Sequence, residues 1–184
     1  MSAGHGHVDP SNRKVALLIS VLALALAFSE TLGKSAQTSA LSYNIEASNL
    51  WAFFQAKTIR QTTMRTAAEQ LDAQFPDKAP EAVSKQVRKW KDTADRYQSE
   101  TDTQEGRTEL AARAKAAESK RDVSLAAYHH YELASAAMQI AIVLASAEII
   151  TGVVALTWIA GGLGVLGIAF CVIGFWFPTA VHLF

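Results

Sequence analysis

One acidic residue inside a long apolar stretch is the strongest candidate for chemistry in this chain. Between Leu133 and Phe184 the only charged side chain is that of Glu148, and there is no lysine or arginine. An ionised carboxylate inside a bilayer costs at least about 2.5 kcal/mol, so it should face a bundle interior, a wet cavity or another subunit. Glu148 is therefore a candidate intramembrane functional acid that relays a proton or cation; a neutral, hydrogen-bonded packing role is the favoured alternative.

A second candidate combines aromatic rings with two cations. Trp51, Phe53 and Phe54 are followed by Lys57 and Arg60 within three turns of helix. Cations at this spacing could stack on the rings or pair with acids of a neighbouring helix. The predicted interaction surface comprises Leu50, Trp51, Phe53, Phe54, Lys57, Arg60, Trp90 and Tyr97. We interpret Trp51 as the residue where this helix meets both its intrachain partner and a second chain, with an exposed ligand site as the alternative.

The remaining residues predict no catalytic, cofactor or metal site. Neither a phosphate-binding glycine loop nor a hydrolase or metalloprotease motif occurs. The adjacent His129 and His130 would point about 100° apart on a helix, which is unsuitable for a shared metal; we expect Tyr128–Glu132 to form an aromatic belt at a membrane interface. With 17 basic and 17 acidic residues, the chain predicts no attraction to nucleic acid. We expect a protein that is not an enzyme.

The first apolar run, residues 15–33, is long enough to cross a bilayer. It lies between Lys14 and Lys34, contains Glu30 as its only charge, and would form roughly 28 Å of helix. Its basic flank and apolar core also resemble a secretory signal peptide. Because the sequence starts at Met1, we expect an uncleaved anchor that follows a flexible tail, residues 1–14.

The C-terminal apolar region has room for two more spans. We expect them at residues 133–159 and 165–184, separated by a break at Ala160–Gly164, where three glycines weaken the helix. This arrangement would place Glu148 roughly 22 Å into the second span, past the middle of the bilayer.

Between the first and second spans, residues 34–132 have the composition of a soluble helical domain. The segment carries 15 basic and 14 acidic side chains and is rich in alanine, glutamine and other helix formers. Its two clear breaks are Phe75–Pro80 and Thr101–Gly106. Because the chain must leave the membrane and return to it, we expect an elongated, coiled-coil-like helical hairpin with arms at residues 34–75 and 80–132, on a base of three transmembrane helices.

Apolar residues at helical spacing mark the faces on which the two arms should pack. In the returning arm a seam of alternating four- and three-residue spacing comprises Val83, Val87, Trp90, Ala94 and Tyr97. The outgoing arm carries a similar line, interrupted by two polar residues: Leu50, Phe54, Lys57, Gln61, Met64, Ala68, Leu71 and Phe75. A second apolar face lies nearly opposite this line and comprises Leu41, Ile45, Ala52 and Ile59. One partner helix cannot cover both faces.

Three stretches together resemble one protein family: FSETLGKSAQT at residues 28–38, EASNLWAFFQAKTIRQT at 46–62, and AYHHYELA followed by QIAIVLASA within 127–147. They are similar to bacterial membrane proteins of the domain of unknown function family 4337. The similarity extends over nearly the whole chain after the N-terminal tail. It implies a bacterial inner-membrane protein with a helical soluble portion, and it provides no catalytic residues.

Charges near the membrane ends favour a cytoplasmic position for the middle domain. Two basic residues precede the first span, whereas five lie next to the membrane within the middle domain: Lys34, Arg113, Lys115, Lys120 and Arg121. The resemblance of the first span to a signal anchor, with its N-terminus inside, favours the opposite orientation.

Two functional hypotheses remain. The first is a structural or scaffolding membrane protein whose helical domain self-associates or docks a larger membrane complex; the exposed second apolar face favours it. The alternative is a small oligomeric channel or transporter subunit with a path lined by Glu148. In both hypotheses the partners are the lipid bilayer and other membrane-protein chains.

Overall fold

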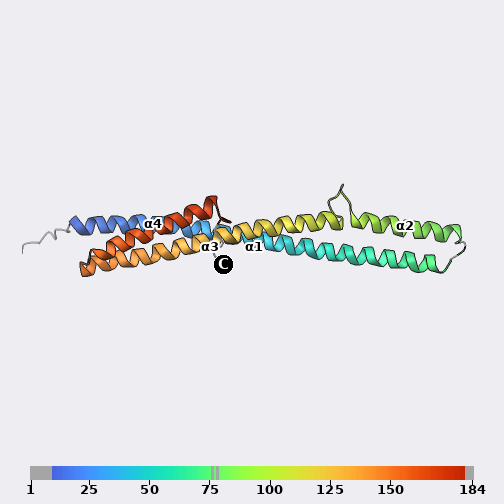
Figure 1. The fold of residues 1–184 in the computed structure, drawn as a ribbon, viewed down its shortest axis with the longest axis horizontal. Coiled ribbons are helices and arrows are strands. Elements are labelled where there is room, and N and C mark those ends of the chain that lie inside the picture. Colours follow the sequence, from blue (N-terminus) through green and yellow to red (C-terminus); the bar gives the residue numbers. More distant parts are fainter. Residues whose placement is uncertain (1–9, 76, 78, 181–184) are drawn as a thin grey trace, which may run out of the picture. The chain divides into compact units, whose positions relative to one another are not determined.

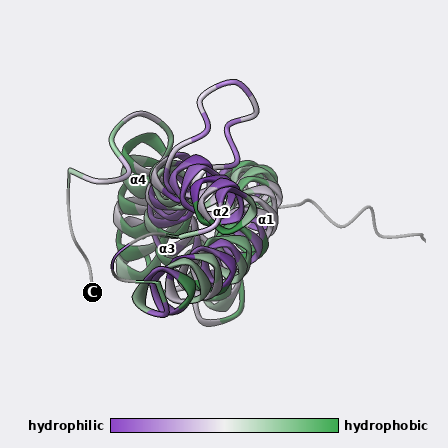
Figure 2. Ribbon diagram, turned by 90° about the vertical axis from the view of Figure 1, so that its right-hand side faces the viewer, coloured by the Kyte–Doolittle hydropathy of each residue, from purple (hydrophilic) through white to green (hydrophobic). Residues whose placement is uncertain are grey.

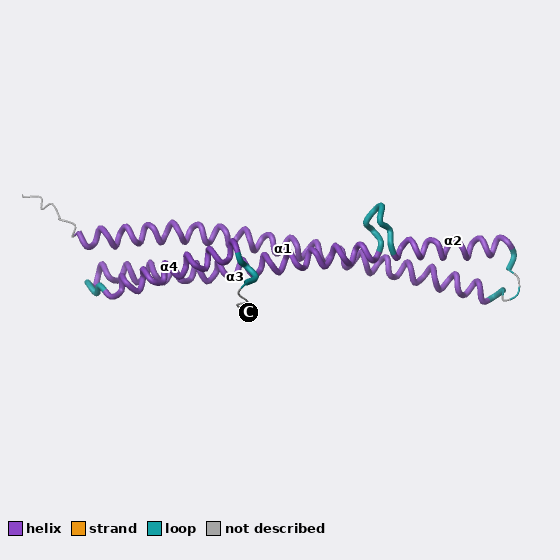
Figure 3. The backbone as a smooth tube through the Cα atoms, turned by 45° about the horizontal axis from the view of Figure 1, so that its top comes forward, coloured by secondary structure: helices purple, strands orange, loops and turns teal. Residues whose placement is uncertain are grey.

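Four helices account for most of the chain (Figure 1). The computed structural model describes residues 10–75, 77 and 79–180. The helices are α1 (Pro10–Ala73), α2 (Glu81–Gln98), α3 (Arg107–Thr151) and α4 (Ala155–Trp176), and no strand occurs in the described residues (Figure 3). The predicted all-α class is confirmed. Most of the N-terminal tail, with His5 and His7, and residues 181–184, with His182, lie outside the described residues.

Three helices are long and apolar enough to cross a membrane, as the sequence predicts: α1, α3 and α4. In Figure 2, α4 is mostly hydrophobic and α2 mostly hydrophilic. The 64 residues of α1 contain both the first apolar run and the outgoing arm without interruption. Proline at its first position is compatible with a helix start, because the fixed φ of proline suits the first helical turn.

The predicted boundary between the second and third spans is wrong. The sequence placed the break at Ala160–Gly164, but α3 ends at Thr151 and α4 begins at Ala155. Gly152 adopts a φ of +71° and its N–H donates to the Glu148 carbonyl at 2.7 Å, a helix C-terminal turn for which glycine is well suited. The expected helices 133–159 and 165–184 are therefore replaced by the second part of α3 and by Ala155–Trp176.

The glycines that were expected to break the helix lie inside α4, where one of them, Gly164, contacts a neighbouring helix, as does the later Gly167. A Cβ at Gly164 would lie 2.6 Å from Leu22 Cδ2, and one at Gly167 would lie 3.0 Å from Met138 Cγ. Glycine is common at such positions in membrane helices because it lets two backbones approach closely.

The chain divides into two compact units, to each of which α1 and α3 contribute. The first comprises residues 1–40 and 122–184. Its apolar core contains small residues of α3 and α4 together with larger ones of α1: Val15, Leu22, Ala141, Ala145 and Ala160. The Ser29 hydroxyl donates to the Tyr131 carbonyl at 2.9 Å and accepts from Ser135 Oγ at 3.0 Å, which joins α1 to α3.

The second unit, Leu41–Arg121, is an antiparallel helical hairpin. Contacts pair successively later residues of α1 with earlier ones of α3 and α2: Trp51 with Glu118, Gln61 with Ala94, and Asp72 with Lys91. The predicted arms are thus confirmed as packed helices. The returning arm is interrupted between Gln98 and Arg107, close to the predicted break at Thr101–Gly106.

Candidate functional site

The predicted apolar line of α1 faces the inside of the hairpin. Ala47 and Leu50 pack in a buried cluster with Leu110, Ala114 and Ala117 of α3, and Trp51, Phe53 and Phe54 lie against it. On α2, Val87 and Ala94 are buried, whereas Trp90 and Tyr97 are half-buried on the same seam. The structure thus brings most of the predicted interaction residues into the hairpin interior.

Trp51 has a partner within the chain. Its indole Nε1–H donates to Glu118 Oε1 at 2.9 Å, and its ring meets Phe54 edge-on with centroids 5.5 Å apart. Because Glu118 belongs to the returning arm, the indole helps to hold the two arms together. A contact between Trp51 and a second chain stays a prediction.

Lys57 is a buried cation at the centre of the hairpin. Its Nζ lies 3.6 Å from Glu100 Oε2 and 3.8 Å from Glu105 Oε2. The same atom lies 5.4 Å from the Phe53 ring centroid and 5.2 Å from that of Tyr97. The prediction that a cation here would stack on rings and pair with acids of the returning arm is confirmed for Lys57. Arg60 is exposed.

Gln61 and Arg107 complete a polar cluster that the sequence did not identify. Gln61 Nε2 donates to the Ala94 carbonyl and to Gln98 Oε1, both at 3.1 Å, and Gln61 Oε1 accepts from Arg107. The Arg107 guanidinium lies 5.0 Å from the centroid of the Phe54 ring. The sequence feature that could have revealed this cluster is the interruption of the apolar α1 line by Lys57 and Gln61. Both polar residues lie beside the loop that interrupts the returning arm.

The second apolar face of α1 is exposed, as the sequence predicted. Leu41, Ile45 and Ile59 retain 60%, 52% and 67% of their accessible surface, and Ala52 is also exposed. Scattered exposed apolar residues are ordinary, but these recur on one side of one helix. No described part of the chain covers this face.

Glu148 lies in the last turn of α3. Because α3 ends at Thr151 and not at residue 159, only three helical residues follow Glu148. The side chain is nevertheless buried, with 4% exposure, and its Oε2 has no hydrogen-bond partner among the described residues. Thr157 Oγ1 of α4 is likewise buried without a partner in that part of the chain.

The packing register of α3 on α4 relates the positions of these two unpartnered groups. Gly167 lies against Met138, and Gly174 lies against Tyr131, which is one heptad earlier on α3. Continued toward the turn, the same register places Thr157 opposite Glu148. A carboxyl and a hydroxyl in this arrangement could share a proton or bind a small cation between them.

The expected aromatic belt at Tyr128–Glu132 is wrong for two of its members. His130 and Tyr131 are buried, with 0% and 5% exposure, because α4 packs over them. The His130 ring stacks on Phe170, with centroids 6.3 Å apart, and its Nε2 lies 3.2 Å from the Pro178 carbonyl oxygen. No cluster of three or more metal-ligating side chains occurs within the described ranges.

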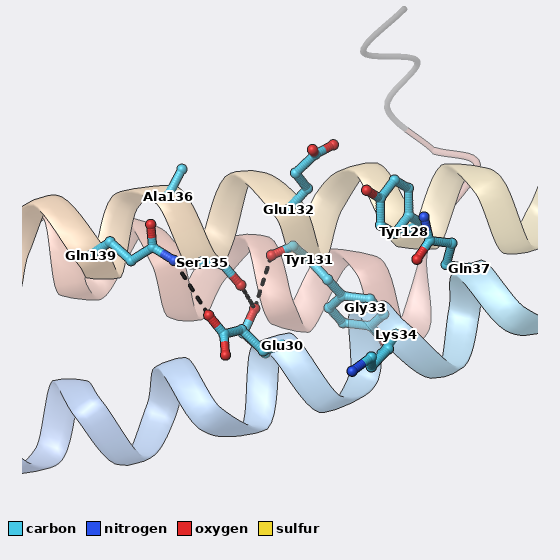
Figure 4. Close-up of a pocket in the computed structure, with 11 residues that line it drawn as sticks. Glu30, Gly33, Lys34, Gln37, Tyr128, Tyr131, Glu132, Ser135, Ala136 and Gln139 are labelled. Atoms are coloured by element: carbon cyan, nitrogen blue, oxygen red, sulfur yellow. Dashed lines mark hydrogen bonds between the residues drawn. The ribbon is translucent and has the colours of Figure 1, made fainter.

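A groove lined by both polar and apolar groups opens between α1 and α3 in the first unit (Figure 4). It has a volume of about 420 Å³, and its polar lining includes Glu30, Lys34, Gln37, Tyr128, Glu132 and Gln139. Gln139 Nε2 donates to Glu30 Oε1 at 3.3 Å. In the sequence Glu30 and Lys34 only mark the end of the first apolar run. The groove was not predicted, since its two walls are distant in the sequence.

Comparison with known proteins places the chain in a family and goes no further. Among curated proteins and among solved structures, no match was found. Residues 11–177 match the family described as "Domain of unknown function (DUF4337)". Since the match includes the apolar helices, both arms of the hairpin and the groove, the chain belongs to the DUF4337 family.

Proposed function

We propose that this protein is a non-enzymatic membrane scaffold that self-associates through the second apolar face of α1, which lies in the second unit. The observation that carries the proposal is the exposed apolar face formed by Leu41, Ile45, Ala52 and Ile59. Three apolar helices would anchor the chain in the bacterial inner membrane, with the hairpin on the cytoplasmic side. The sequence offers no constellation of nucleophile, base and acid that would favour catalysis.

The second apolar face belongs to a longer line of uncharged residues that has the spacing of a two-helix coiled-coil seam. Steps of four and three residues connect Leu41, Ile45, Ser48, Ala52, Gln55, Ile59, Thr62 and Thr66. Every member except Ser48, Gln55 and the threonines is apolar, and all are exposed. A partner helix could follow this line for several turns.

The residues beside the line favour a second copy of the same chain as the partner. Two copies inserted in one membrane with the same orientation run parallel, so each residue meets its own counterpart across a symmetric seam. Charged flanks would then repel one another. The flanking positions are instead neutral over most of the line: Ser42, Asn44, Asn49, Trp51, Ala56, Thr58 and Thr63.

Such a seam should be weak in solution and effective in a membrane. Ser48, Gln55 and Thr62 lower its apolar content below that of a stable coiled coil. Confinement of both copies to the same bilayer raises their effective concentration without any new contact. Association should therefore decrease when the protein is diluted in detergent.

Cysteine crosslinking tests this seam. In a Cys171→Ser background, Ala52→Cys should form a disulfide with itself in native membranes under mild oxidation, because the two Cβ atoms meet across a parallel seam. Ala116→Cys is the matched control, since Ala116 is also an exposed alanine of the second unit but belongs to α3. Equal crosslinking at the two positions, or none at Ala52→Cys, would contradict the proposal.

The buried Glu148 favours a second candidate function, the exchange of a proton or cation in an oligomer. Its support is that Glu148 Oε2 and Thr157 Oγ1 are both buried without a hydrogen-bond partner among the described residues. Proton flux into proteoliposomes tests it: Glu148→Gln should abolish flux while the protein remains folded and assembled. Wild-type vesicles that leak no faster than empty ones would exclude this function.

A further inference from the structure

We propose that the groove between α1 and α3 in the first unit binds the headgroup of a phospholipid that carries a phosphate and a primary ammonium. The groove is defined by Glu30 and Lys34 on α1 and by Tyr128, Glu132 and Gln139 on α3 (Figure 4). The inference rests on the proposed membrane insertion and is independent of self-association.

The position of the groove along the chain corresponds to the headgroup level of a bilayer. Glu30 and Lys34 lie where the first apolar run ends, and Glu132 lies where the second begins. Polar and amphipathic side chains at such boundaries meet lipid headgroups, not acyl chains. A groove at this depth is open to a ligand that lies in the membrane.

The charges in the groove match a zwitterion better than a simple ion. One carboxylate, Glu30, and one ammonium, Lys34, lie one turn apart on α1 in the groove. Within the described residues, neither of them forms an ion pair. The carboxylate of Glu132 lies on the other side of α3 in Figure 4, and its Oε2 is 3.7 Å from His129 Nδ1. A lone anion would be repelled by Glu30 and a lone cation by Lys34.

Hydrogen bonding then selects among zwitterionic headgroups. A primary ammonium has three N–H donors, of which at least one can bond the carboxylate of Glu30, while the phosphate accepts from Lys34. A quaternary ammonium has no N–H and cannot make these bonds. The Gln139 amide already donates to Glu30 Oε1, which holds this carboxylate in place with its other oxygen available.

An apolar surface continues from the groove toward the centre of the spans. Leu26 lies one turn before Glu30 on the same face of α1, and Val143 lies one turn after Gln139 on α3. Leu26 is half-buried, and Val143 retains 66% of its accessible surface. Acyl chains attached to a headgroup in the groove could lie along these residues.

Native mass spectrometry of the delipidated full-length protein in detergent tests the inference. Phosphatidylethanolamine, phosphatidylcholine and phosphatidylglycerol with identical acyl chains are added at equal concentration. We expect phosphatidylethanolamine adducts to exceed each of the others by about fivefold, as a few exposed charge-assisted contacts allow. Equal adduct levels for phosphatidylethanolamine and phosphatidylcholine would overturn the inference.

Two variants and one matched control connect the preference to the groove. Lys34→Gln and Glu30→Gln should each reduce phosphatidylethanolamine adducts to the phosphatidylcholine level. Lys14→Gln removes another exposed lysine of α1 outside the groove and should leave the preference unchanged. Circular dichroism confirms that each variant keeps its helices. A preference that survives Lys34→Gln would contradict the assignment.

Two further measurements show which assumption is wrong if the expected lipid preference is not found. Free phosphoethanolamine at the concentration of the lipid should not displace it, because it lacks acyl chains; efficient displacement would overturn the lipid assignment. Resistance of the wild-type protein to carbonate extraction from membranes is measured in parallel. A protein released by carbonate contradicts the proposed function, whereas a retained protein without lipid preference contradicts only this inference.

Discussion

At the scale of single residues, Lys57 has the most demanding environment in the hairpin. Its ammonium is buried, with only 7% of its side chain exposed, between Glu100 and Glu105. The side chain of Glu105 is 48% exposed, so solvent screens that pair, while Glu100 at 21% is better shielded. The pair with Glu100 and the two ring contacts should therefore account for most of the contribution of Lys57 to stability.

We expect Lys57→Met to lower the free energy of unfolding by roughly 1–3 kcal/mol, because it leaves the partly buried Glu100 with only the exposed Arg96 as a cation, at 3.6 Å. Chemical unfolding of the full chain in detergent, followed by circular dichroism, measures the change. Arg60→Gln is the control: it removes an exposed cation nearby and should change stability by less than about 0.5 kcal/mol. Equal losses in the two variants would show that Lys57 contributes only as an exposed charge.

Glu109 makes the loop between α2 and α3 sensitive to acid. The Ser99 hydroxyl donates to Glu109 Oε1 at 2.6 Å, and the Glu100 N–H donates to Oε2 at 3.2 Å. The hydrogen bond from Ser99, supported by backbone amides, holds the pKa of Glu109 below its ordinary value of 4.5. A depressed folded-state pKa means that this stabilisation is complete above pH 4.5 and is lost as the pH falls through the lower folded value.

Hydrogen exchange of residues 99–106, corrected for the intrinsic effect of pH, should therefore show faster opening as the pH falls below 4.5. Glu109→Gln lacks the titrating group, so its loop should be more open above this pH and change less on acidification. An unchanged pH response in Glu109→Gln would assign the acid sensitivity to Asp102, Glu105 or another carboxylate.

At the scale of elements, α4 packs through glycines that admit no side chain. A Cβ at Gly167 would lie 3.0 Å from Met138 Cγ and 3.1 Å from the Ala134 carbonyl oxygen. The flexible Met138 side chain can move away, but the Ala134 carbonyl belongs to the helix backbone and cannot. By contrast, a Cβ at Gly162 has no atom of a neighbouring element within 4 Å.

Gly167→Val should consequently push α4 away from α3 and destabilise the protein by about 1–3 kcal/mol. Gly162→Val places the same side chain in open space and serves as the matched control. Thermal unfolding in detergent should show a lower midpoint for Gly167→Val alone. If both variants unfold at the wild-type temperature, the close contact of α4 with α3 is not maintained in the protein.

At the scale of the whole molecule, the proposed topology can be probed in the loop between α2 and α3. Gly106 is a poor position for a reporter, because a Cβ there would lie 2.7 Å from Ser99 Cα. Thr103 is exposed in the preceding turn. A single cysteine at Thr103 therefore reports the side of the membrane with less disturbance.

In a Cys171→Ser background, Thr103→Cys should resist a membrane-impermeant maleimide in intact cells and react after the membrane is permeabilised, as a cytoplasmic hairpin requires. In the proposed topology a single span separates residue 3 from the hairpin, so Ala3→Cys should show the reverse pattern. Labelling of Thr103→Cys in intact spheroplasts would place the hairpin outside.

The hairpin could be predicted from sequence because its periodicity is local. The seam of α2 and the line through Leu50 use helical spacing within single elements, and both face inward as expected. The α3–α4 turn could not be predicted in the same way, since three glycines at 161–164 gave a stronger breaking signal than the single Gly152. Packing against Leu22 and Met138 overrides that signal. For the same reason the sequence did not predict that Glu148 lies in the last turn of its helix.

The groove between α1 and α3 was beyond sequence reasoning for a different reason. Its walls meet through contacts such as Ser29 with Tyr131, whose register depends on the packing of small residues. No repeat within either helix specifies which residues face one another across this distance. Lys57 was predictable only in part. Its stacking on aromatic rings follows from helical spacing, but its partner Glu105 lies in an irregular loop that has no such spacing.

The short turn between α3 and α4 has a consequence for biosynthesis. Gly152, Val153 and Val154 carry no charge, and the N–H groups of Leu156 and Thr157 donate to the carbonyls of Val153 and Val154. In the proposed topology little polar material needs to be translocated across the bilayer, so α3 and α4 could enter it together as a preformed pair. Since the turn offers no cation to retain on either side, the direction of entry is set by the basic residues that precede the apolar part of α3, Lys120 and Arg121.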